Sequence, residues 1–172
     1  MSNYKLPDGI SAFTIIQNGI GNKLMSNVTI QSEDRHIDVM ALWDTGATIS
    51  CISHDVVDKL GLIPCGITPI LTPSGGKECN QYLISTITLP NNVILKDVPV
   101  CDSEIGGQGF GFLIGMNIIT LGDFAICNSS GKTSFTFRMP AVQGHRIDFV
   151  KQINVSNCIG RPNSNRKSTK HR

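Results

Sequence analysis

Short β-rich runs, separated by clusters of glycine, asparagine and proline, follow one another along most of this 172-residue sequence. Runs of this length, bounded by turn-forming residues, are typical of β-strands and hairpins. We expect strands in the segments Phe13–Ile20, Leu24–Ile30, His36–Trp43, Ala47–Ile52, Tyr82–Leu89, Val93–Val100, Phe110–Ile114, Asp123–Cys127 and Thr133–Arg138. The pattern therefore predicts a mainly β fold.

Two segments have helical signals instead. Ser53 precedes a short amphipathic run that ends at Leu60, and Gly61 follows as a helix terminator. A second short helix is expected over Met116–Leu121. Beyond Met139 the pattern weakens, although Ile147–Val150 has the character of a further edge strand.

Composition favours one globular domain. Hydrophobic residues make up 40% of the chain and charged residues 16%, which is too apolar for long-range disorder. No apolar run approaches the roughly 18 residues of a membrane-spanning helix. The first ten residues, MSNYKLPDGI, lack the basic start and apolar stretch of a secretory signal, so we expect a cytoplasmic protein without membrane contact.

The net charge of +2 conceals a basic end. Residues 161–172 contain five Lys or Arg and no acid, whereas residues 1–160 contain ten Lys or Arg against thirteen Asp or Glu. A basic tail can bind nucleic acid or an anionic surface. The segment contains no aromatic residue for base stacking, which favours a disordered, solubilising tail and makes nucleic acid an unlikely partner.

The six cysteines are expected to be reduced thiols. They include no Cys-x-x-Cys pair and no Cys/His cluster with the spacing of a zinc site, so we expect no metal and no cofactor. Several lie in apolar, strand-like surroundings, where a free cysteine behaves as a small hydrophobic residue. The cysteines are at positions 51, 65, 79, 101, 127 and 158.

The strongest candidate for a functional site is the segment where an apolar run ends, Leu42-Trp43-Asp44-Thr45-Gly46-Ala47. A carboxylate at this place has to be hydrogen-bonded or neutralised, because burying an unpaired charge costs several kcal/mol. Thr45 offers a hydroxyl, and Gly46 allows a backbone N–H to approach the carboxylate. On these three letters alone, a plain turn between two strands remains the alternative.

A second motif, later in the sequence, favours a functional site over a plain turn. Nearly seventy residues later comes Phe112-Leu-Ile-Gly-Met-Asn-Ile-Ile119, and the two motifs together resemble the retropepsin-like aspartic proteases over residues 25–140. The continuation through Gly122–Ile126 and Gly131–Arg138 is similar to the bacterial and phage-associated branch. The resemblance implies a single-lobe closed β-barrel or sandwich with one or two short helices. It also implies that a strand ending in Ile114-Gly115 threads the loop that carries Asp44.

The resemblance implies roles for individual residues. Asp44, Thr45 and Gly46 would be catalytic. The segment Thr72–Lys77 lies where the family has its flap, although an exposed hairpin turn fits it too. The residues expected to contact substrate are Ala47, Thr48, Ser74, Gly75, Gly76 and Ile114.

Only one Asp-Thr-Gly occurs, whereas peptide hydrolysis by carboxylates needs two acids that share a proton. We therefore expect a two-fold homodimer with one Asp44 from each chain. Retroviral members have an Asp directly after Asp-Thr-Gly-Ala and an Arg directly after Ile-Gly. Here those positions are Thr48 and Met116, so both charges of that pair are missing together.

We expect four segments: an N-terminal strand or extension over 1–24, the protease domain over 25–140, a C-terminal extension over 141–160 and the basic tail over 161–172. The favoured function is an aspartic endopeptidase acting on peptides or unfolded proteins. One alternative is a catalytically silent module that binds peptides or only dimerises. The other is a nucleic-acid-associated protein that acts through its tail.

Overall fold

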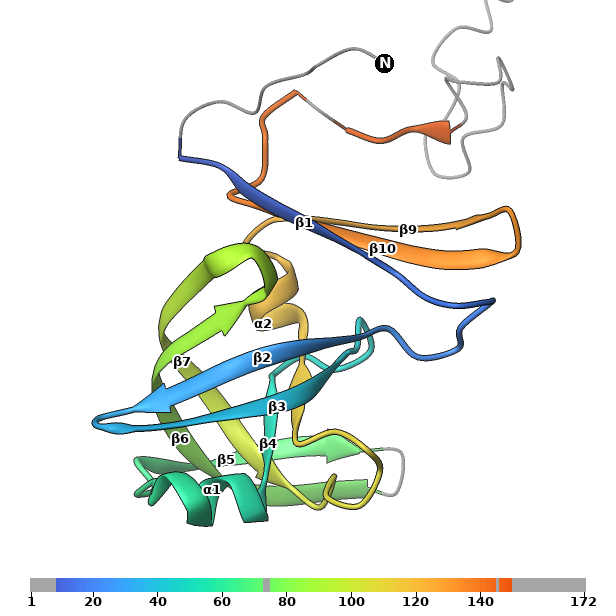
Figure 1. The fold of residues 1–172 in the computed structure, drawn as a ribbon. Helices are drawn as coiled ribbons and strands as arrows, with labels where there is room; N and C mark the ends of the chain where they lie inside the picture. Colours follow the sequence, from blue (N-terminus) through green and yellow to red (C-terminus); the bar gives the residue numbers. More distant parts are fainter. Residues whose placement is uncertain (1–8, 73–74, 145, 150–172) are drawn as a thin grey trace, which may run out of the picture. The chain divides into compact units, whose positions relative to one another are not determined.

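The structure, a computed structural model, describes residues 9–72, 75–144 and 146–149. The chain divides into two units, Met1–Val142 and Gln143–Arg172, and the first contains all the strands and helices described below (Figure 1). None of the helices in the described ranges is long and apolar enough to cross a membrane. The predicted basic tail, 161–172, lies outside the described residues.

In the second unit, the expectation of an edge strand over Ile147–Val150 is wrong. Ile147 and Asp148 are not in a strand, and Val150 is outside the described residues. Arg146 binds Asp148 two residues further on, at 3.1 Å, and the Ile147 side chain is exposed. An alternating pattern forms a strand only where a partner strand supplies its backbone hydrogen bonds.

Six strands of the first unit close into a barrel, which confirms the predicted mainly β class. They pair in the order β2, β3, β8, β4, β7, β6, and β6 pairs back to β2. Their bounds are β2 (Met25–Ser32), β3 (Arg35–Trp43), β4 (Cys51–Ser53), β6 (Gly75–Leu89), β7 (Val93–Ser103) and β8 (Phe112–Ile114). Because β6 pairs back to β2, each of these two end strands has a partner strand on both sides over the paired residues.

A hairpin extends from the barrel wall. β5 (Gly66–Thr72) pairs antiparallel with residues 75–81 of β6, whereas the later part of β6 pairs with β7 and β2. The sequence pattern predicted only the barrel half of β6, from Tyr82 to Leu89. The other half is rich in polar residues, and its pairing depends on β5 rather than on a buried face.

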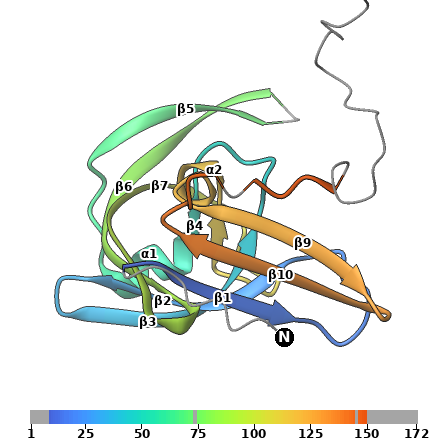
Figure 2. The same ribbon diagram turned by 90° about the horizontal axis from the view of Figure 1, so that it is seen from above.

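A separate three-stranded antiparallel sheet has the order β1 (Ser11–Ile16), β10 (Lys132–Met139), β9 (Asp123–Ser129). Figure 2 shows β10 between the other two strands. The turn between β9 and β10 is Ser130-Gly131, with φ of 53° and 71°. Positive φ at both central residues is what a two-residue hairpin turn requires, so the predicted hairpin is confirmed.

Two short α-helices accompany the barrel, α1 (His54–Leu60) and α2 (Met116–Ile119), together with a 3₁₀ turn at Pro90–Asn92. Gly61 ends α1 in the left-handed conformation, with φ of 63°, as the sequence predicts. α2 is shorter than predicted. The Thr120 hydroxyl donates to the Met116 carbonyl at 2.7 Å, and the chain turns at Gly122, where a Cβ would lie 2.1 Å from the Arg138 carbonyl oxygen.

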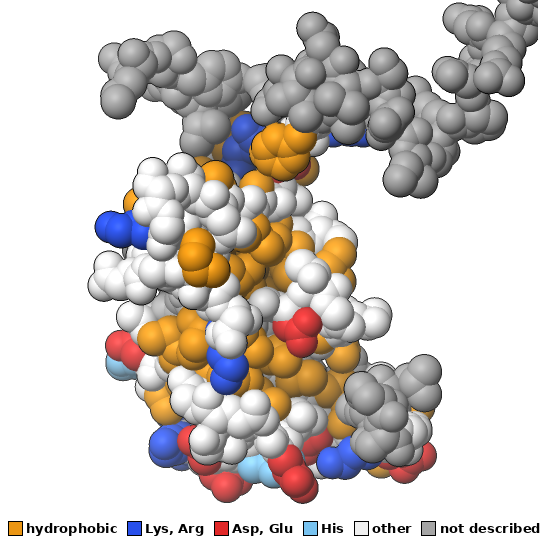
Figure 3. Space-filling view, turned by 90° about the vertical axis from the view of Figure 1, so that its right-hand side faces the viewer, with side chains coloured by type: hydrophobic (Ala, Val, Ile, Leu, Met, Phe, Trp, Pro, Cys, Tyr) orange, Lys and Arg blue, Asp and Glu red, His pale blue; other side chains and the backbone are white. Residues whose placement is uncertain are grey.

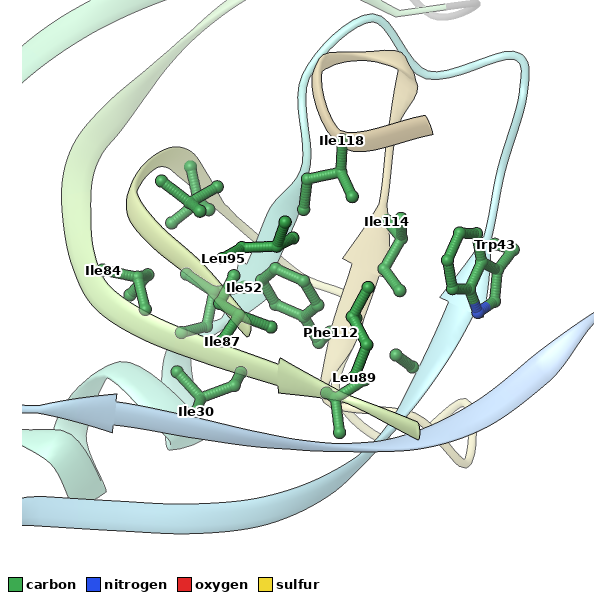
Figure 4. Close-up of a cluster of buried hydrophobic side chains, with 14 of the residues drawn as sticks. Ile30, Trp43, Ile52, Ile84, Ile87, Leu89, Leu95, Phe112, Ile114 and Ile118 are labelled. Atoms are coloured by element: carbon green, nitrogen blue, oxygen red, sulfur yellow. The ribbon is translucent and has the colours of Figure 1, made fainter. Parts of the chain in front are cut away.

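Buried aliphatic side chains fill the barrel around Phe112, which is fully buried (Figure 4). They come from both short strands, β4 and β8, and from the long strands of the wall. Burial of this kind stabilises the fold by roughly 1.5–3 kcal/mol for each large apolar side chain. The labelled members of the cluster are Ile30, Trp43, Ile52, Ile84, Ile87, Leu89, Leu95, Phe112, Ile114 and Ile118.

Trp43 joins the barrel to the three-stranded sheet. Its ring stacks on Phe124 of β9, with centroids 5.3 Å apart and planes 5° from parallel, and lies 5.1 Å from the Phe137 ring of β10. Its Nε1 donates to the Ser26 hydroxyl of β2 at 3.0 Å, and both residues are buried. Because Trp43 is the last residue of β3, this packing also holds the start of the loop that follows.

The five described cysteines are free thiols, and three of them, Cys51, Cys79 and Cys101, lie on neighbouring strands. Burial is the main reason that the pKa of Cys51 is raised to about 11 and that of Cys101 to about 12. The thiolate is the reactive form, so both residues are expected to be inert near neutral pH.

The Trp43–Ser26 bond is tested by a double-mutant cycle. Trp43→Phe removes the donor and leaves a buried hydroxyl unpaired, so we expect unfolding free energy to fall by about 1–3 kcal/mol beyond the effect of ring size. Adding Ser26→Ala to Trp43→Phe removes that hydroxyl and recovers part of the loss. Urea unfolding of the four proteins measures the coupling, and a coupling energy of zero contradicts the assignment.

The thiols are tested by alkylation with mass-spectrometric mapping. Exposed Cys65 and Cys127 should react at pH 8, whereas Cys51 and Cys101 should react only after unfolding. Between the ordinary thiol pKa of 9.0 and about 11, the unfolded chain loses protons that folded Cys51 retains. Stability should therefore decrease as pH rises through this range, and Cys51→Ala should reduce that decrease.

Candidate active site

A strand threads the loop that carries Asp44. β8 lies between β3 and β4, parallel to β3 and antiparallel to β4. The chain leaves the barrel at the end of β3, passes through residues 44–50, and returns as β4 on the other side of β8. This is the arrangement that the resemblance implies for the two motifs.

Asp44 is held by backbone groups on both sides. Its N–H donates to the Ile114 carbonyl of β8 at 2.9 Å, and its Oδ1 accepts the Gly46 N–H at 2.8 Å. The side chain is partly buried, and no ion pair joins it to a described Lys, Arg or His. The carboxylate is thus oriented without a cationic partner, which leaves its second oxygen to act on another group.

Ser50 and Asn117 link the two motifs. The Ser50 hydroxyl donates to Asn117 Oδ1 at 2.8 Å and accepts the Gly115 N–H at 3.0 Å. Asn117 Oδ1 also accepts the Ser50 N–H at 2.8 Å, and its Nδ2 donates to the Pro99 carbonyl of β7 at 3.1 Å. Ser50 is fully buried, so these bonds satisfy groups that water cannot reach.

The first residues of α2 bond to the same loop. The Met116 N–H donates to the Ala47 carbonyl at 2.8 Å, and the Asn117 N–H donates to the Thr48 carbonyl at 3.1 Å. A Cβ on Gly115 would lie 2.7 Å from the carbonyl carbon of Ile49. Only glycine allows this approach, which explains the glycine of the second motif.

These contacts correct the predicted strand over Ala47–Ile52, because only its end belongs to β4. Residues 47–50 form a loop: the Ala47 and Thr48 carbonyls accept N–H groups of α2, and the Ser50 N–H donates to the Asn117 side chain. Only the Ser50 carbonyl, which accepts the Cys101 N–H of β7, bonds to a strand. β8 is likewise shorter than predicted, since it begins at Phe112 rather than Phe110. Thr48 and Ile49 are β-branched and Phe110 is aromatic, which are residue types enriched in strands, and this is the property that the pattern detected.

The structure brings together most of the predicted site residues. Thr45, Gly46 and Thr48 are exposed on the loop, and Ala47 is partly buried beside them. Ile114 lies in the core, and its backbone carbonyl, not its side chain, contacts Asp44. Gly75 and Gly76 are exposed at the start of β6, on a different hairpin, and Ser74 lies outside the described residues.

Sequence reasoning assigned no role to Ser50, and it treated Asn117 only as a match to the motif. The signal was present, because each polar residue interrupts an apolar run, Ile49-Ser50-Cys51 and Met116-Asn117-Ile118. A buried polar residue needs a partner, but the partners here are 67 residues apart in the chain. Their pairing becomes evident only in the folded chain.

The residues in place of the retroviral ion pair have other roles. Met116 packs against the hydrophobic core, and Thr48 is exposed while its carbonyl receives the Asn117 N–H. In the described ranges, no group of three His, Cys, Asp or Glu side chains is placed to hold a metal ion. What the site offers is therefore a hydrogen-bonded carboxylate on a rigid loop, suited to proton transfer.

Comparisons with known proteins agree with this geometry. The sequence profile of a family described as aspartyl protease matches residues 27–118, which include the first motif, all but the last residue of the second, and both arms of the threaded loop. Among curated proteins, none matches this chain in sequence.

Two solved structures are similar in fold. A retropepsin-like aspartic protease from Rickettsia conorii shares 12% sequence identity, with a TM-score of 0.49 over 76% of this chain and 94% of that one. The simian foamy virus (mac) protease shares 20% identity, with a TM-score of 0.41 over 56% of this chain and 91% of that one. The family profile covers more than half of the chain, and so this protein belongs to the aspartyl protease family.

Proposed function

We propose that this protein is an aspartic endopeptidase that hydrolyses peptide bonds with two Asp44 carboxylates, one from each subunit of a homodimer. The observation that carries the proposal is the Asp44 carboxylate itself. It is oriented by the Gly46 N–H, has no described cation beside it, and is held on a loop braced by Ser50 and Asn117. Because a bond from an Asp side chain to the N–H two residues on is common in turns, the support comes from the Ser50–Asn117 bonds that fix the loop.

The chemistry needs a second carboxylate. Two like charges in contact cannot both ionise, so a pair of Asp44 side chains shares one proton. The ionised member takes a proton from a water whose oxygen attacks the scissile carbonyl carbon, while the protonated member donates to the carbonyl oxygen. As the C–N bond breaks, a proton passes to the leaving amine, and the pair returns to its starting state.

No other acid in the described chain has a setting like that of Asp44. Asp102 accepts two bonds from Asn80 on the barrel wall, and Asp123 is paired with Arg138. Asp55 bonds to Ser53 and Lys59 at the start of α1, and the Ser53 bond is the main reason that its pKa is lowered. These acids are engaged elsewhere, which supports a second copy as the source of the other carboxylate.

The hairpin of β5 and β6 is proposed to cover the bound peptide. Residues 75–80 pair only with β5, and Gly75 through Glu78 are exposed. Gly75 has φ of 123°, which side-chain-bearing residues rarely adopt. An exposed hairpin arm with glycines offers backbone groups to an extended substrate, which is why Gly75 and Gly76 stay in the proposal as substrate contacts.

Asp44→Asn tests the two-carboxylate proposal. We expect the variant to fold and dimerise but to lose cleavage of a peptide library between about pH 4 and 7, where a shared-proton pair operates. Asp58→Asn, an exposed acid on α1, is the matched control and should retain activity. Equal activity in Asp44→Asn and wild type contradicts the proposal, and inactive wild-type protein favours the silent module.

Mixing subunits tests the shared site. When Asp44→Asn and wild-type chains are mixed in equal amounts and allowed to exchange, only wild-type homodimers keep two carboxylates. Activity should fall to about one quarter of that of the same total concentration of wild type. A value near one half means that each chain acts alone, and the homodimer is then wrong.

Asn117→Ala tests the brace beneath Asp44. It removes the bonds to Ser50 and Pro99, so we expect kcat to fall about 10- to 100-fold because the carboxylate loses its position. Gln31→Ala also deletes an amide side chain that donates to a backbone carbonyl, that of Glu33 at 3.3 Å, but in the β2–β3 hairpin, and should leave kcat unchanged. If both variants lower kcat equally at a temperature where both are folded, the brace has no specific role.

A further inference from the structure

The first part of β3 has a free edge. β2 pairs with β3 on one side from Arg35 onward, whereas β8 covers the other side only at residues 41–43. On that second side, the Met40 carbonyl accepts the Gly111 N–H at 3.0 Å. Because backbone groups point alternately to the two sides of an antiparallel strand, the N–H groups of Asp38 and Met40 point the same way. Within the described chain, no strand pairs with β3 at these residues on that side.

A groove of about 500 Å³ lies beside the free edge. It is lined by residues 37–40 of β3, by Asp55, Val56 and Lys59 of α1, and by residues of the loop 106–111 that leads into β8. Figure 1 shows α1 and this loop at the lower end of the barrel. Unpaired backbone groups along a groove are suited to an extended chain, which adds a strand to an exposed sheet edge.

Part of the lining is apolar, and it leaves room for side chains. Val56 and Val39 come together at Gly111, where a Cβ would lie 3.0 Å from Val56 Cγ2 and 3.5 Å from Val39 Cγ1. Gly107 and Gly109 bring no side chain into the groove, and a Cβ on either would meet no atom within 4 Å. The glycine-rich loop therefore leaves open space that the side chains of a bound segment can fill.

The charge of the groove favours a basic occupant. Lys59 pairs with Asp55 at 3.4 Å, which leaves Asp38 as the uncompensated charge of the lining. Its Oδ1 accepts the Thr29 hydroxyl at 2.5 Å, and no described cation is paired with it. A carboxylate on a sheet edge disfavours acidic strands and admits strands that carry lysine or arginine.

The two faces of β3 set the side-chain pattern of that occupant. Ile37 and Val39 pack against the hydrophobic core, whereas Asp38, between them, is exposed on the other face. A strand added beside β3 alternates in the same way, with aliphatic side chains next to Val39 and Val56 and basic side chains next to Asp38. Figure 3 shows charged side chains gathered at the lower end of the molecule, where α1 lies in Figure 1, and hydrophobic side chains above them.

We propose that this groove binds an extended segment of another protein, which adds a strand to the free edge of β3. The segment has lysine or arginine alternating with aliphatic residues. The groove is separate from the catalytic loop, because Met40 lies four residues before Asp44, roughly 13 Å along the strand. Binding at the groove needs neither the Asp44 carboxylate nor a second copy of the chain.

Binding of a short peptide tests the groove. The probe is a seven-residue peptide of alternating lysine and valine, capped at both ends, and the protein is Asp44→Asn, so that no cleavage consumes the probe. We expect this peptide to bind at least about 10-fold more tightly than the same peptide with glutamate in place of lysine, measured by calorimetry.

A charge reversal in the protein locates the preference. In the same background, Asp38→Lys should reverse the preference between the two peptides. Asp58→Lys is the matched control, since it makes the same change at an exposed position of α1 that does not line the groove, and it should keep the preference. Absence of binding overturns the proposal, and so does a preference that Asp38→Lys leaves unchanged.

Hydrogen exchange followed by NMR tests the added strand directly. The N–H groups of Ile37 and Val39 point toward β2, whereas those of Asp38 and Met40 point toward the groove. The lysine–valine peptide should slow exchange of the Asp38 and Met40 N–H groups at least about 10-fold and leave Ile37 and Val39 unchanged. Slowing on the β5–β6 hairpin instead, or no slowing, overturns the proposal.

The groove and the catalytic mechanism fail independently. Asp38→Lys alone should lose the lysine–valine peptide and still cleave a peptide library as wild type does. If it loses cleavage too, the groove and the catalytic loop form one site and the separate site is wrong. If the peptide binds the groove and wild-type protein cleaves nothing, the groove stands and the two-carboxylate mechanism is wrong.

Discussion

The passage of β8 through the loop between β3 and β4 is the constraint on which the rest of the site depends. It requires a residue without a side chain at Gly115, because any Cβ there would meet the Ile49 backbone. It also buries polar groups that only Ser50 and Asn117 satisfy for one another. A buried, fully bonded network of this kind has one geometry, and a single geometry is what places Asp44 reproducibly.

Trp43 extends that constraint to the three-stranded sheet. The Trp43 ring, directly before Asp44, packs against Phe13, Phe124 and Phe137, one from each strand, while its indole N–H donates to Ser26 of β2. The position of the three-stranded sheet and the position of the loop after β3 are therefore coupled through one buried ring, that of Trp43.

Much of the architecture follows from local patterns, and the exceptions have physical reasons. Strands with one buried face, such as β2 and β10, alternate clearly, and the turns at Gly61 and Ser130-Gly131 have the residues that their φ angles require. The segment 47–50 looked like a strand because Thr48 and Ile49 are β-branched, yet most of its backbone bonds are made to α2 and to the Asn117 side chain. The outer half of the β5–β6 hairpin has no buried face, so no periodic signal marked it.

The sequence by itself determined the two motifs: one Asp-Thr-Gly after an apolar strand, and a second motif with a glycine and an asparagine. These are properties of neighbouring residues, and they are readable without a fold. Only the tertiary structure decided that Ser50 meets Asn117 and that Trp43 packs against all three strands of the second sheet. Such facts depend on which distant segments become neighbours when the chain closes its barrel.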